Sequence, residues 1–479
     1  MGIKQFCKEK LNIPKLGLSK TQRIGISLTL LFFYFFFFIS SSGRNGSNDG
    51  GHLALASTIY FDHQLEIEKY NGNYISRPDY AIKDGVMYSD RLPGNAICII
   101  PFLAYSDAMK SILPEATASK GDYFYISATL LPNLAGVVGL FLLFLLSYHL
   151  FSFDYRLSMS LVIICGLATL HQLESTHIYS HIISLVGITF AVYLTVLGKN
   201  SKSWNWTLYA NAFIIGFFTL VELQNILFII PIFFYLMITN NVSLLKFKTY
   251  INNRTIITAG ILLFFLGLLL SYNYVTFGEF FLKSNKYNPF FEEEKTFLTA
   301  LSGNFFEGLD NLITSFNNLP AYLDWSLAVN NGTPGILIAN PIFILSFLGF
   351  IPFYKKNKAE ALLFLSMIII AILIAAFHVT TLIRHIFTIH VLLFFPLAFF
   401  INLIKTQKRP LQYLLYGTLA SLTLLSIVKE IYLNNHYWGR NYDYTHFEYF
   451  KNLDVFVYLN LPVLIIVGTS LFYKHKRTV

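Results

Sequence analysis

The feature that most constrains this chain is a series of long, almost uncharged apolar runs spread over its whole length. About 20 helical residues cross the hydrocarbon core of a bilayer, which is about 30 Å thick. Backbone polar groups at that depth must be satisfied within the segment, so helices are the expected spanning form. With 55% hydrophobic and 13% charged residues, the chain is predicted to be a polytopic membrane protein of the all-α class.

Twelve transmembrane helices are predicted within a single integral membrane domain, residues 1–479. The first run follows a basic leader but is longer than a signal-peptide core and lacks a clear cleavage site, so we expect it to remain as span one. The three cysteines are scattered and indicate neither a disulfide framework nor a thiolate metal site. The predicted spans cover about residues 24–42, 124–150, 157–171, 180–198, 207–222, 224–240, 256–275, 336–353, 360–378, 385–403, 411–428 and 455–473.

Lysine and arginine placement predicts the orientation of these spans, because cytoplasmic loops hold the excess of basic residues. With both termini cytoplasmic, the inner segments hold 21 basic and three acidic residues, and the outer segments hold 14 basic and 23 acidic residues. The two sides therefore carry +18 and −9, which together make the net charge of +9. Every basic cluster is a short cap at a span end, so the net charge reports topology and does not indicate a nucleic-acid partner.

This orientation places the long loops on the outer side, and loops of such length in a compact protein are usually functional or disordered. Stretches such as "HLALASTIYFDHQLEI" and "NFFEGLDNLITSF" have spacings that favour amphipathic helices over disorder. We therefore expect any chemistry at the outer membrane surface. The three outer loops are residues 43–123, which we interpret as the catalytic loop, 276–335 and 429–454.

The first outer loop carries the most informative residues. Asp49 follows span one within "GSNDGGH", at the place where a lipid tail and a water-borne acceptor both arrive. Near an apolar surface a carboxylate pKa rises toward that of a useful base. The alternative is that Asp49 caps an amphipathic helix starting at His52. Asp84 and Asp90, in "KDGVMYSDRLPGN", are either substrate-binding residues or turn residues.

The same loop resembles the first extracytoplasmic loop of GT-C-type membrane glycosyltransferases. The residues that carry the resemblance are "SNDGGHLALASTIYFDHQLEIEKY" and "DYAIKDGVMYSDRLPGNAICIIPFLAY". More narrowly, they are similar to prokaryotic relatives of the dolichyl-phosphate mannose and lipid A aminoarabinose transferases. That family has an Asn/Ser-rich stretch after span one, followed by a "dG.YYSdk.PG" motif and an apolar run.

The resemblance implies an inverting transferase of the plasma membrane, with a role in cell-envelope glycosylation. Asp49 matches the position of the family's catalytic base, and Tyr88 and Arg91 lie in the motif that would bind substrate. The implied donor is a polyprenyl-phosphate monosaccharide. A lipid, a glycan or a protein remains open as the acceptor, and no cofactor is implied with certainty.

Glycosyl transfer passes through an oxocarbenium-like state and releases a phosphate whose charge must be stabilised. Arg384, in "FHVTTLIRHIFTIH", lies in a very short predicted outer turn and suits a bidentate contact with phosphate. The family often carries an arginine near this place. His385 beside it is a second candidate donor to phosphate. The alternative for both is an interfacial anchor at a helix start.

A second polar cluster, "TLHQLESTHIYSHIIS", lies in the outer turn between spans three and four. Glu174, His177 and His181 are an alternative set of ligands for a divalent metal, with the two histidines four residues apart. They fit an interfacial polar belt equally well. The family has an aromatic and polar turn here that lines the donor pocket, which implies substrate contacts for Glu174, His177 and Tyr179.

Glu222 lies at the junction of two apolar runs, where an unpartnered carboxylate is costly. It either faces the substrate cavity or caps the outer turn.

Two other functions compete with a transferase. A transporter or flippase of lipid-linked saccharides would place ionisable residues or Gly/Pro breaks near mid-span, within repeated segments. A noncatalytic GT-C-like subunit would tolerate replacement of Asp49.

Overall fold

The structure is a computed structural model. It describes residues 17–41, 47–72, 80–112, 120–199, 201, 204–240, 253–282, 284–289, 303–313, 335–377, 383–436, 460–463 and 465. Nearly all regular structure in these residues is helical, as the apolar runs predict. The described helices outside the predicted loops are α2 (Lys20–Ser40), α5 (Lys120–Phe144), η3 (Leu145–Leu150), α6 (Tyr155–Ala168), α7 (His171–Glu174), α8 (Ser180–Leu197), α9 (Trp204–Thr219), η4 (Leu223–Phe228), α10 (Ile229–Thr239), α11 (Asn253–Phe277), α15 (Ile336–Ala339), α16 (Phe343–Lys356), α17 (Lys358–Ala376), η9 (Ile383–Leu393), α18 (Phe394–Ile404) and α19 (Arg409–His436).

The predicted all-α, multi-pass character is confirmed. Within the described residues, seven helical segments are long and apolar enough to cross a membrane: Lys20–Ser40, Phe124–Leu150, Ser180–Leu197, Asn253–Phe277, Lys358–Ala376, His385–Ile404 and Arg409–Lys429. Two shorter apolar helices, Tyr155–Ala168 and Leu223–Thr239, lie at further predicted spans. The predicted span 336–353 is broken, because α15 ends at Ala339 and α16 begins at Phe343. The count of twelve stays a prediction, since most of 455–473 lies outside the described residues.

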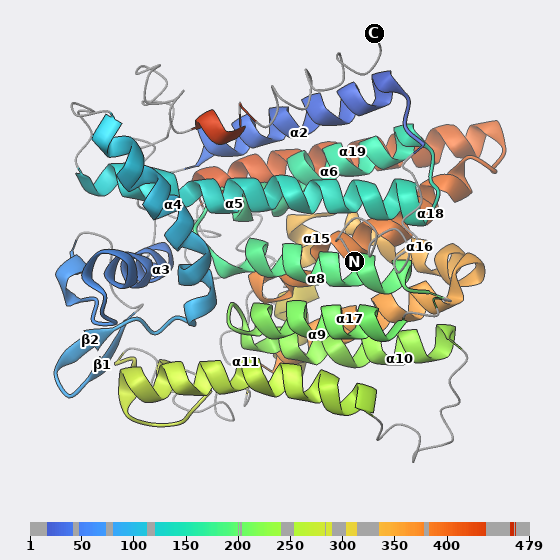
Figure 1. Ribbon diagram of the computed structural model, residues 1–479. Coiled ribbons are helices and arrows are strands. Elements are labelled where there is room, and N and C mark those ends of the chain that lie inside the picture. Colours follow the sequence, from blue (N-terminus) through green and yellow to red (C-terminus); the bar gives the residue numbers. More distant parts are fainter. Residues whose placement is uncertain are drawn as a thin grey trace, which may run out of the picture.

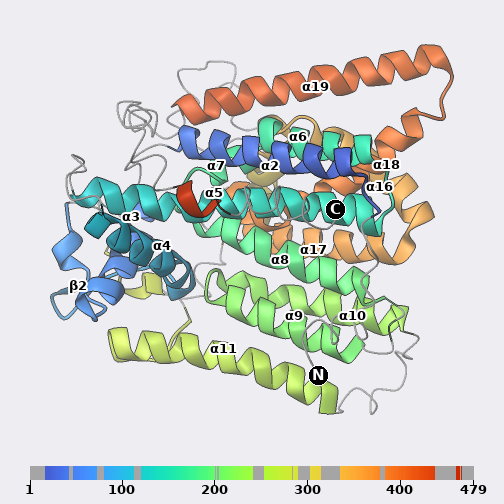
Figure 2. The same ribbon diagram turned by 45° about the horizontal axis from the view of Figure 1, so that its top comes forward.

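The long helices form a bundle in which α2, α5, α8, α9 and α10 follow one another across the molecule (Figure 1). Helices α11 and α19 lie at opposite edges of this bundle in the turned view (Figure 2). Only 17% of the α11 span and 6% of the α19 span is buried, against 89% of His385–Ile404. The two edge helices therefore offer most of their apolar surface to lipid.

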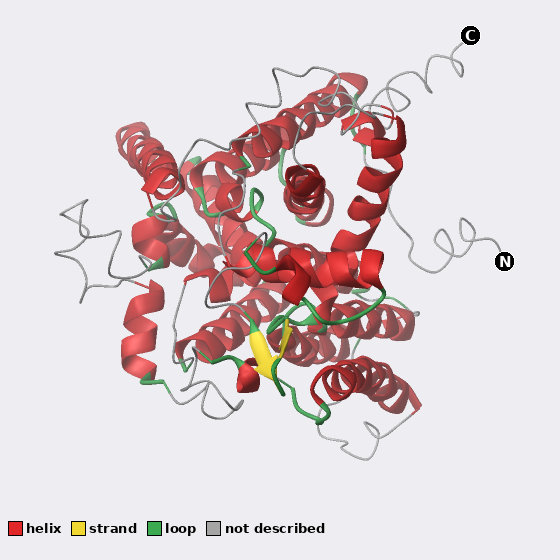
Figure 3. Ribbon diagram, turned by 90° about the vertical axis from the view of Figure 1, so that its left-hand side faces the viewer, coloured by secondary structure: helices red, strands yellow, loops and turns green. Residues whose placement is uncertain are grey.

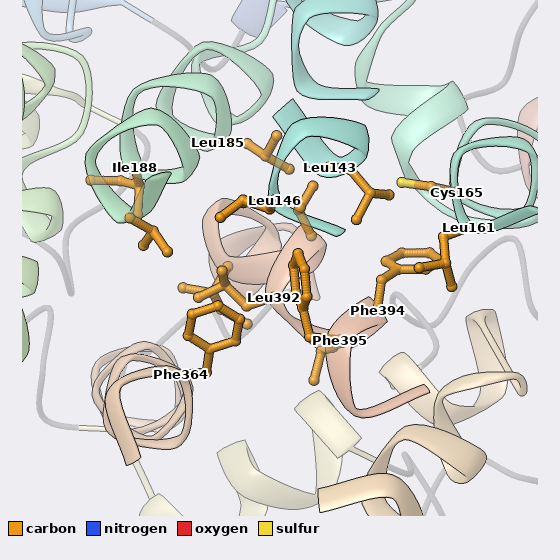
Figure 4. Close-up of a cluster of buried hydrophobic side chains, with 14 of the residues drawn as sticks. Leu143, Leu146, Leu161, Cys165, Leu185, Ile188, Phe364, Leu392, Phe394 and Phe395 are labelled. Carbon is orange, nitrogen blue, oxygen red and sulfur yellow. The ribbon is translucent and has the colours of Figure 1, made fainter. Parts of the chain in front are cut away.

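The centre of the bundle is a packed apolar core (Figure 4). Lipid tails are as apolar as leucine, so packing between spans stabilises this core more than hydrophobic transfer does. Close packing is visible between α16 and α18, where a Cβ on Gly349 would lie 1.8 Å from the Pro396 carbonyl oxygen. The core side chains come from α5, η3, α6, α8, α17, η9 and α18, and include Leu143, Leu146, Leu161, Cys165, Leu185, Ile188, Phe364, Leu392, Phe394 and Phe395.

The basic residues and the first predicted outer loop lie at opposite ends of the bundle. Helices α2, α6, α11, α17 and α19 begin at one end, where α8, α10, α16 and α18 stop (Figure 1). Of the basic residues predicted to be inside, those that the structure describes lie at or next to these termini, among them Arg23, Arg156 and Lys355. One buried acid there, Glu360, accepts hydrogen bonds from Lys199 Nζ (2.7 Å) and the Tyr235 hydroxyl (2.9 Å). The charge pattern thus separates the two ends, and their assignment to the two sides of the membrane stays a prediction.

The other end is closed by the first predicted loop. It contains α3 (Ser47–Ser57), η1 (Thr58–Asp62), η2 (Glu68–Tyr70), the two-stranded sheet of β1 (Ala81–Lys83) and β2 (Val86–Tyr88), and α4 (Pro93–Ile112). The strands are antiparallel, with Ala81 opposite Tyr88, and their hairpin is the yellow element in the view of this end (Figure 3). Asp84 and Gly85 form the hairpin tip with φ of 52° and 80°, a conformation that Asp-Gly turns favour.

The expected amphipathic character holds for one of the two predicted loop helices. In α13 (Phe305–Ile313), within the second outer loop, Phe306 is 78% exposed while Gly308 and Leu312 are buried. For α3 the prediction was wrong, because residues 49–58 are all buried. Helix α3 is covered on all sides by the other elements of this end. In the third loop, α19 continues to His436, and residues 437–454 lie outside the described part of the chain.

A single glycine fixes how α4 meets the bundle. Helix α4 begins at Pro93, whose fixed φ suits the first helical position. The next residue, Gly94, donates its N–H to the Leu220 carbonyl at 2.8 Å. A Cβ at Gly94 would lie 2.5 Å from the Leu220 backbone carbon, so no other residue fits without a backbone shift.

We predict that Gly94→Ala lowers stability by about 1–3 kcal/mol, the usual cost of overpacking a tight contact. Thermal unfolding of the purified protein in detergent measures the effect. The matched control is Gly267→Ala in α11, where a Cβ meets nothing within 4 Å and alanine favours the helix. Equal midpoints for the two variants would contradict the close approach of α4 to the turn after α9.

Candidate functional site

Asp49 lies in the first turn of α3, which begins at Ser47 and not at His52 as the capping alternative required. Its side chain is completely buried. The Tyr125 hydroxyl of α5 donates a hydrogen bond to Asp49 Oδ2 at 2.9 Å. A carboxylate in the first turn is also favoured by the helix dipole. Asp49 is therefore held inside the end of the bundle by two independent effects.

Helix α3 is seated by apolar contacts with the neighbouring helices. Its Leu53, Leu55 and Ala56 pack in one buried cluster with residues of α4 and α5 and with Ile178 of the turn before α8. The Asn95 side-chain amide of α4 donates to the Ile178 carbonyl at 3.2 Å. This cluster brings α3 and α4 together with the turn that leads into α8.

The loop after the hairpin is tied to α3. The Ser89 hydroxyl donates to the Gly51 carbonyl (3.2 Å) and accepts from the Arg91 N–H (3.2 Å). Asp90 is buried, accepts from the Asn288 amide at 2.8 Å, and has its Oδ1 3.2 Å from Arg91 Nε. The structure thus brings Asp90 and Arg91 to α3.

Two other predicted residues of this loop lie elsewhere. Asp84 is at the exposed hairpin tip, where its side chain is 82% exposed, outside the buried cluster around α3. Its turn role therefore explains its position, and we leave it out of the proposed site. Tyr88 is half-buried and packs edge-on against Phe277 at the end of α11, with 5.5 Å between ring centroids.

His52 is a residue of this site that the sequence analysis missed. It is buried, lies three residues after Asp49 on α3, and its Nδ1 has no hydrogen-bond partner within the described part of the chain. Burial and then the positive charges of Arg91 and His181 hold the pKa of His52 well below its usual value. The ring is therefore neutral at pH 7. The i, i+3 spacing was a usable signal, but placing the helix start at His52 concealed it.

Glu222 is the centre of a buried hydrogen-bond network. His181 Nδ1 of α8 contacts Glu222 Oε1, which also accepts from the Ser180 hydroxyl at 2.9 Å. Oε2 accepts from the Thr388 hydroxyl (3.1 Å) and the Gln224 amide (3.2 Å). The carboxylate joins the start of α8 to η4 and η9. Its burial is offset by these partners, as a buried charge requires.

The same network reaches the predicted phosphate-binding segment. The Gln224 amide also donates to the His385 carbonyl at 3.2 Å, and the rings of His181 and His385 are 6.4 Å apart. The backbone of Arg384 lies in the first turn of η9, while its side chain is outside the described part of the structure. The predicted pair is thus located beside the Glu222 network.

Glu174, His177 and Tyr179 are all buried in the turn between α6 and α8. His177 stacks on Tyr179 with centroids 5.1 Å apart, and its Nδ1 is 2.7 Å from the Leu173 carbonyl. The i, i+4 helical pairing assumed for the metal alternative is not present, because α8 begins at Ser180 and the two histidines do not share a helix. Within the described ranges, no group of three or more His, Cys, Asp or Glu side chains is placed to hold a metal ion.

The fold of this chain is similar to that of a solved membrane protein structure. ArnT from Cupriavidus metallidurans, in a crystal structure bound to undecaprenyl phosphate, aligns with a TM-score of 0.52 and 11% identity. The alignment covers 84% of this chain and 64% of ArnT. The archaeal oligosaccharyltransferase AglB from Archaeoglobus fulgidus, in complex with an inhibitory peptide and a dolichol-phosphate, aligns with a TM-score of 0.46 and 12% identity. That alignment covers 86% of this chain and 56% of AglB. No family model and no curated protein sequence matches the chain.

The chain is therefore a multi-pass membrane protein with an ArnT-like fold. At the level of the fold, the resemblance to GT-C-type transferases that the first loop suggested is confirmed. The chain spans less than two thirds of the length of either structure.

The lowered pKa of His52 predicts a pH effect on stability. The unfolded ring binds a proton near pH 6.5, whereas the folded ring does so only at lower pH. Below pH 6.5 the unfolded state binds more protons, so stability falls as the pH falls, by up to about 1.4 kcal/mol per pH unit for one group. Melting temperatures at pH 7.5 and 5.5 measure this loss.

We expect His52→Gln to show a smaller drop in melting temperature between the two pH values than the native chain. His63→Asn is the control, because His63 is exposed and has a φ of 55° that asparagine tolerates. If His52→Gln and the native chain lost the same stability, the buried neutral state of His52 would be refuted.

Proposed function

We propose that this protein is an inverting glycosyltransferase that moves a sugar from a polyprenyl-phosphate donor to an acceptor on the extracytoplasmic face. The observation that carries the proposal is a completely buried carboxylate, Asp49, one helical turn from the buried His52, whose Nδ1 has no hydrogen-bond partner within the described part of the chain. In our proposal Asp49 is the base and His52 contacts the donor. The undecaprenyl phosphate bound by the structurally similar ArnT supports a donor of this lipid class.

In the proposed reaction, the acceptor hydroxyl oxygen attacks the anomeric carbon of the donor sugar. A new C–O bond forms there, and the bond from the anomeric carbon to the phosphate oxygen breaks, with its electron pair leaving on the phosphate. Asp49 takes the hydroxyl proton during the attack. A single displacement of this kind inverts the anomeric carbon. The products are the glycosylated acceptor and the polyprenyl phosphate.

The leaving phosphate needs positive charge and hydrogen-bond donors. Arg384 and His385, at the start of η9, are the proposed phosphate ligands. Arg91 adds positive charge near His52, and an Nδ1–H of the neutral His52 ring would donate a hydrogen bond to the phosphate. Glu222 has a positioning role, because its contact with His181 Nδ1 fixes the orientation of that ring.

The sugar and acceptor contacts are proposed for residues around this centre. Tyr179 and His177 form a stacked aromatic pair next to His181, with 6.3 Å between the Tyr179 and His181 rings. Both rings are buried, and we assign them to the wall of the sugar site. Asp90 and Glu174 are the polar groups that we assign to substrate hydroxyls.

We predict that Asp49→Asn abolishes sugar transfer, with a loss of about 10²–10⁴-fold, the usual contribution of a general base. Asparagine preserves the size of the side chain and can accept from the Tyr125 hydroxyl, so the fold is retained. The assay is transfer of a radiolabelled sugar from polyprenyl-phosphate donors in reconstituted membranes. Asp84→Asn is the matched control, since its hairpin-tip conformation suits asparagine. Full activity of Asp49→Asn would rule out the catalytic base.

For the phosphate site, we predict that Arg384→Ala raises the donor KM by about tenfold, as expected for the loss of one charge-assisted contact. The KM of the acceptor should change much less. Steady-state kinetics with each substrate varied in turn measures the two values. Equal effects on donor and acceptor would identify Arg384 as an interfacial anchor.

A further inference from the structure

A second site lies at the end of the bundle opposite Asp49. There an open groove of about 1070 Å³ separates α19 from α6, with α2 and α18 at its sides. The turned view shows α19 at the edge of the bundle, beyond α2 and α6 (Figure 2). This volume is slightly above the range of about 300–1,000 Å³ that small-molecule sites occupy. The groove is therefore large enough for a lipid.

The walls of the groove are apolar and continuous along the span. Helix α19 contributes a stripe at helical spacing, consisting of Tyr416, Leu419, Thr423, Leu424 and Ile427. Leu157 and Ile164 of α6 form the facing wall. Within a membrane, apolar surface at this depth contacts acyl chains. The walls thus fit the tails of a lipid, and the mouth of the groove determines which headgroup it takes.

The mouth carries positive charge. Arg156 and Lys405 line it, and Asp154 is the acid among its described lining residues. That carboxylate is already engaged, because it accepts from the Leu157 N–H at 2.8 Å and from Lys405 Nζ at 2.9 Å. Lys356 lines an adjoining cavity of about 410 Å³ that shares Asp154 with the groove. The mouth and its neighbour therefore hold three cations against one anion, which favours an anionic headgroup.

We propose that this groove binds an anionic phospholipid of the membrane leaflet opposite the Asp49 site. Its phosphate lies at Arg156 and Lys405, and its acyl chains lie between α6 and α19. The Tyr416 ring and the Ser160 hydroxyl line the same groove and offer further polar contacts. The bound lipid fills the space that protein atoms leave between α19 and the bundle. It thereby stabilises the weakly packed α19 without taking part in the reaction at Asp49.

The test uses the full-length protein, delipidated in mild detergent, and two lipids with the same acyl chains. Dioleoyl phosphatidylglycerol is anionic, and dioleoyl phosphatidylcholine is its zwitterionic counterpart. Native mass spectrometry measures the affinity for each lipid, and thermal unfolding measures the stabilisation. We expect phosphatidylglycerol to bind at least fivefold more tightly than phosphatidylcholine, since one basic residue near an anionic headgroup contributes about fivefold.

Two variants separate the headgroup from the tails. Arg156 is exposed, so Arg156→Gln should fold normally and lose about fivefold in affinity for phosphatidylglycerol. Thr423→Trp fills the groove and should abolish binding of both lipids. The control is Lys408→Gln, an exposed basic residue at the same end that does not line the groove. Equal binding of the two lipids by the native chain, or native phosphatidylglycerol affinity in Arg156→Gln, would overturn the proposal.

Discussion

The hydrogen bond from the Tyr125 hydroxyl to Asp49, 2.9 Å long, is the contact on which the site depends. It joins the membrane-spanning helix α5 to the short buried helix α3 of the first loop. A buried carboxylate without such a partner is strongly destabilising. Because the partner belongs to α5, Asp49 can sit inside the bundle and keep a fixed position. The apolar cluster around Leu53 and Ile178 then holds the rest of α3 in place.

Close packing at the same end joins segments that are far apart in the sequence. Gly94 lets α4 touch the turn after α9, and Glu222, two residues beyond that contact, gathers donors from α8, η4 and η9. Glycosyl transfer needs a base, a phosphate-binding surface and an entry for lipid at one place. In the proposed function, the bundle end closed by buried helices supplies the first two, and the apolar spans below it supply the third.

Much of this architecture follows from local sequence, because spans are long apolar runs and basic residues collect at their ends. The distribution of lysine and arginine between predicted loops was enough to place Asp49 and the basic residues at opposite ends of the spans. The site was harder to predict, since its contacts are tertiary. The four-residue spacing of His177 and His181 indicated a shared face, but α8 starts between them. The partners of Glu222 come from three elements, and no local pattern reveals them. Of the two alternatives for Asp84, a substrate-binding residue or a turn residue, the structure shows the turn residue.

The most direct measurement is a cryo-EM structure of the Asp49→Asn protein with an intact polyprenyl-phosphate sugar. The substitution should trap the donor before transfer. Our account predicts density for the phosphate beside Arg91, His181 and the start of η9, with the anomeric carbon of the sugar facing residue 49. Density for the sugar phosphate away from these residues, such as at Arg156 on the opposite end of the bundle, would contradict the proposed site.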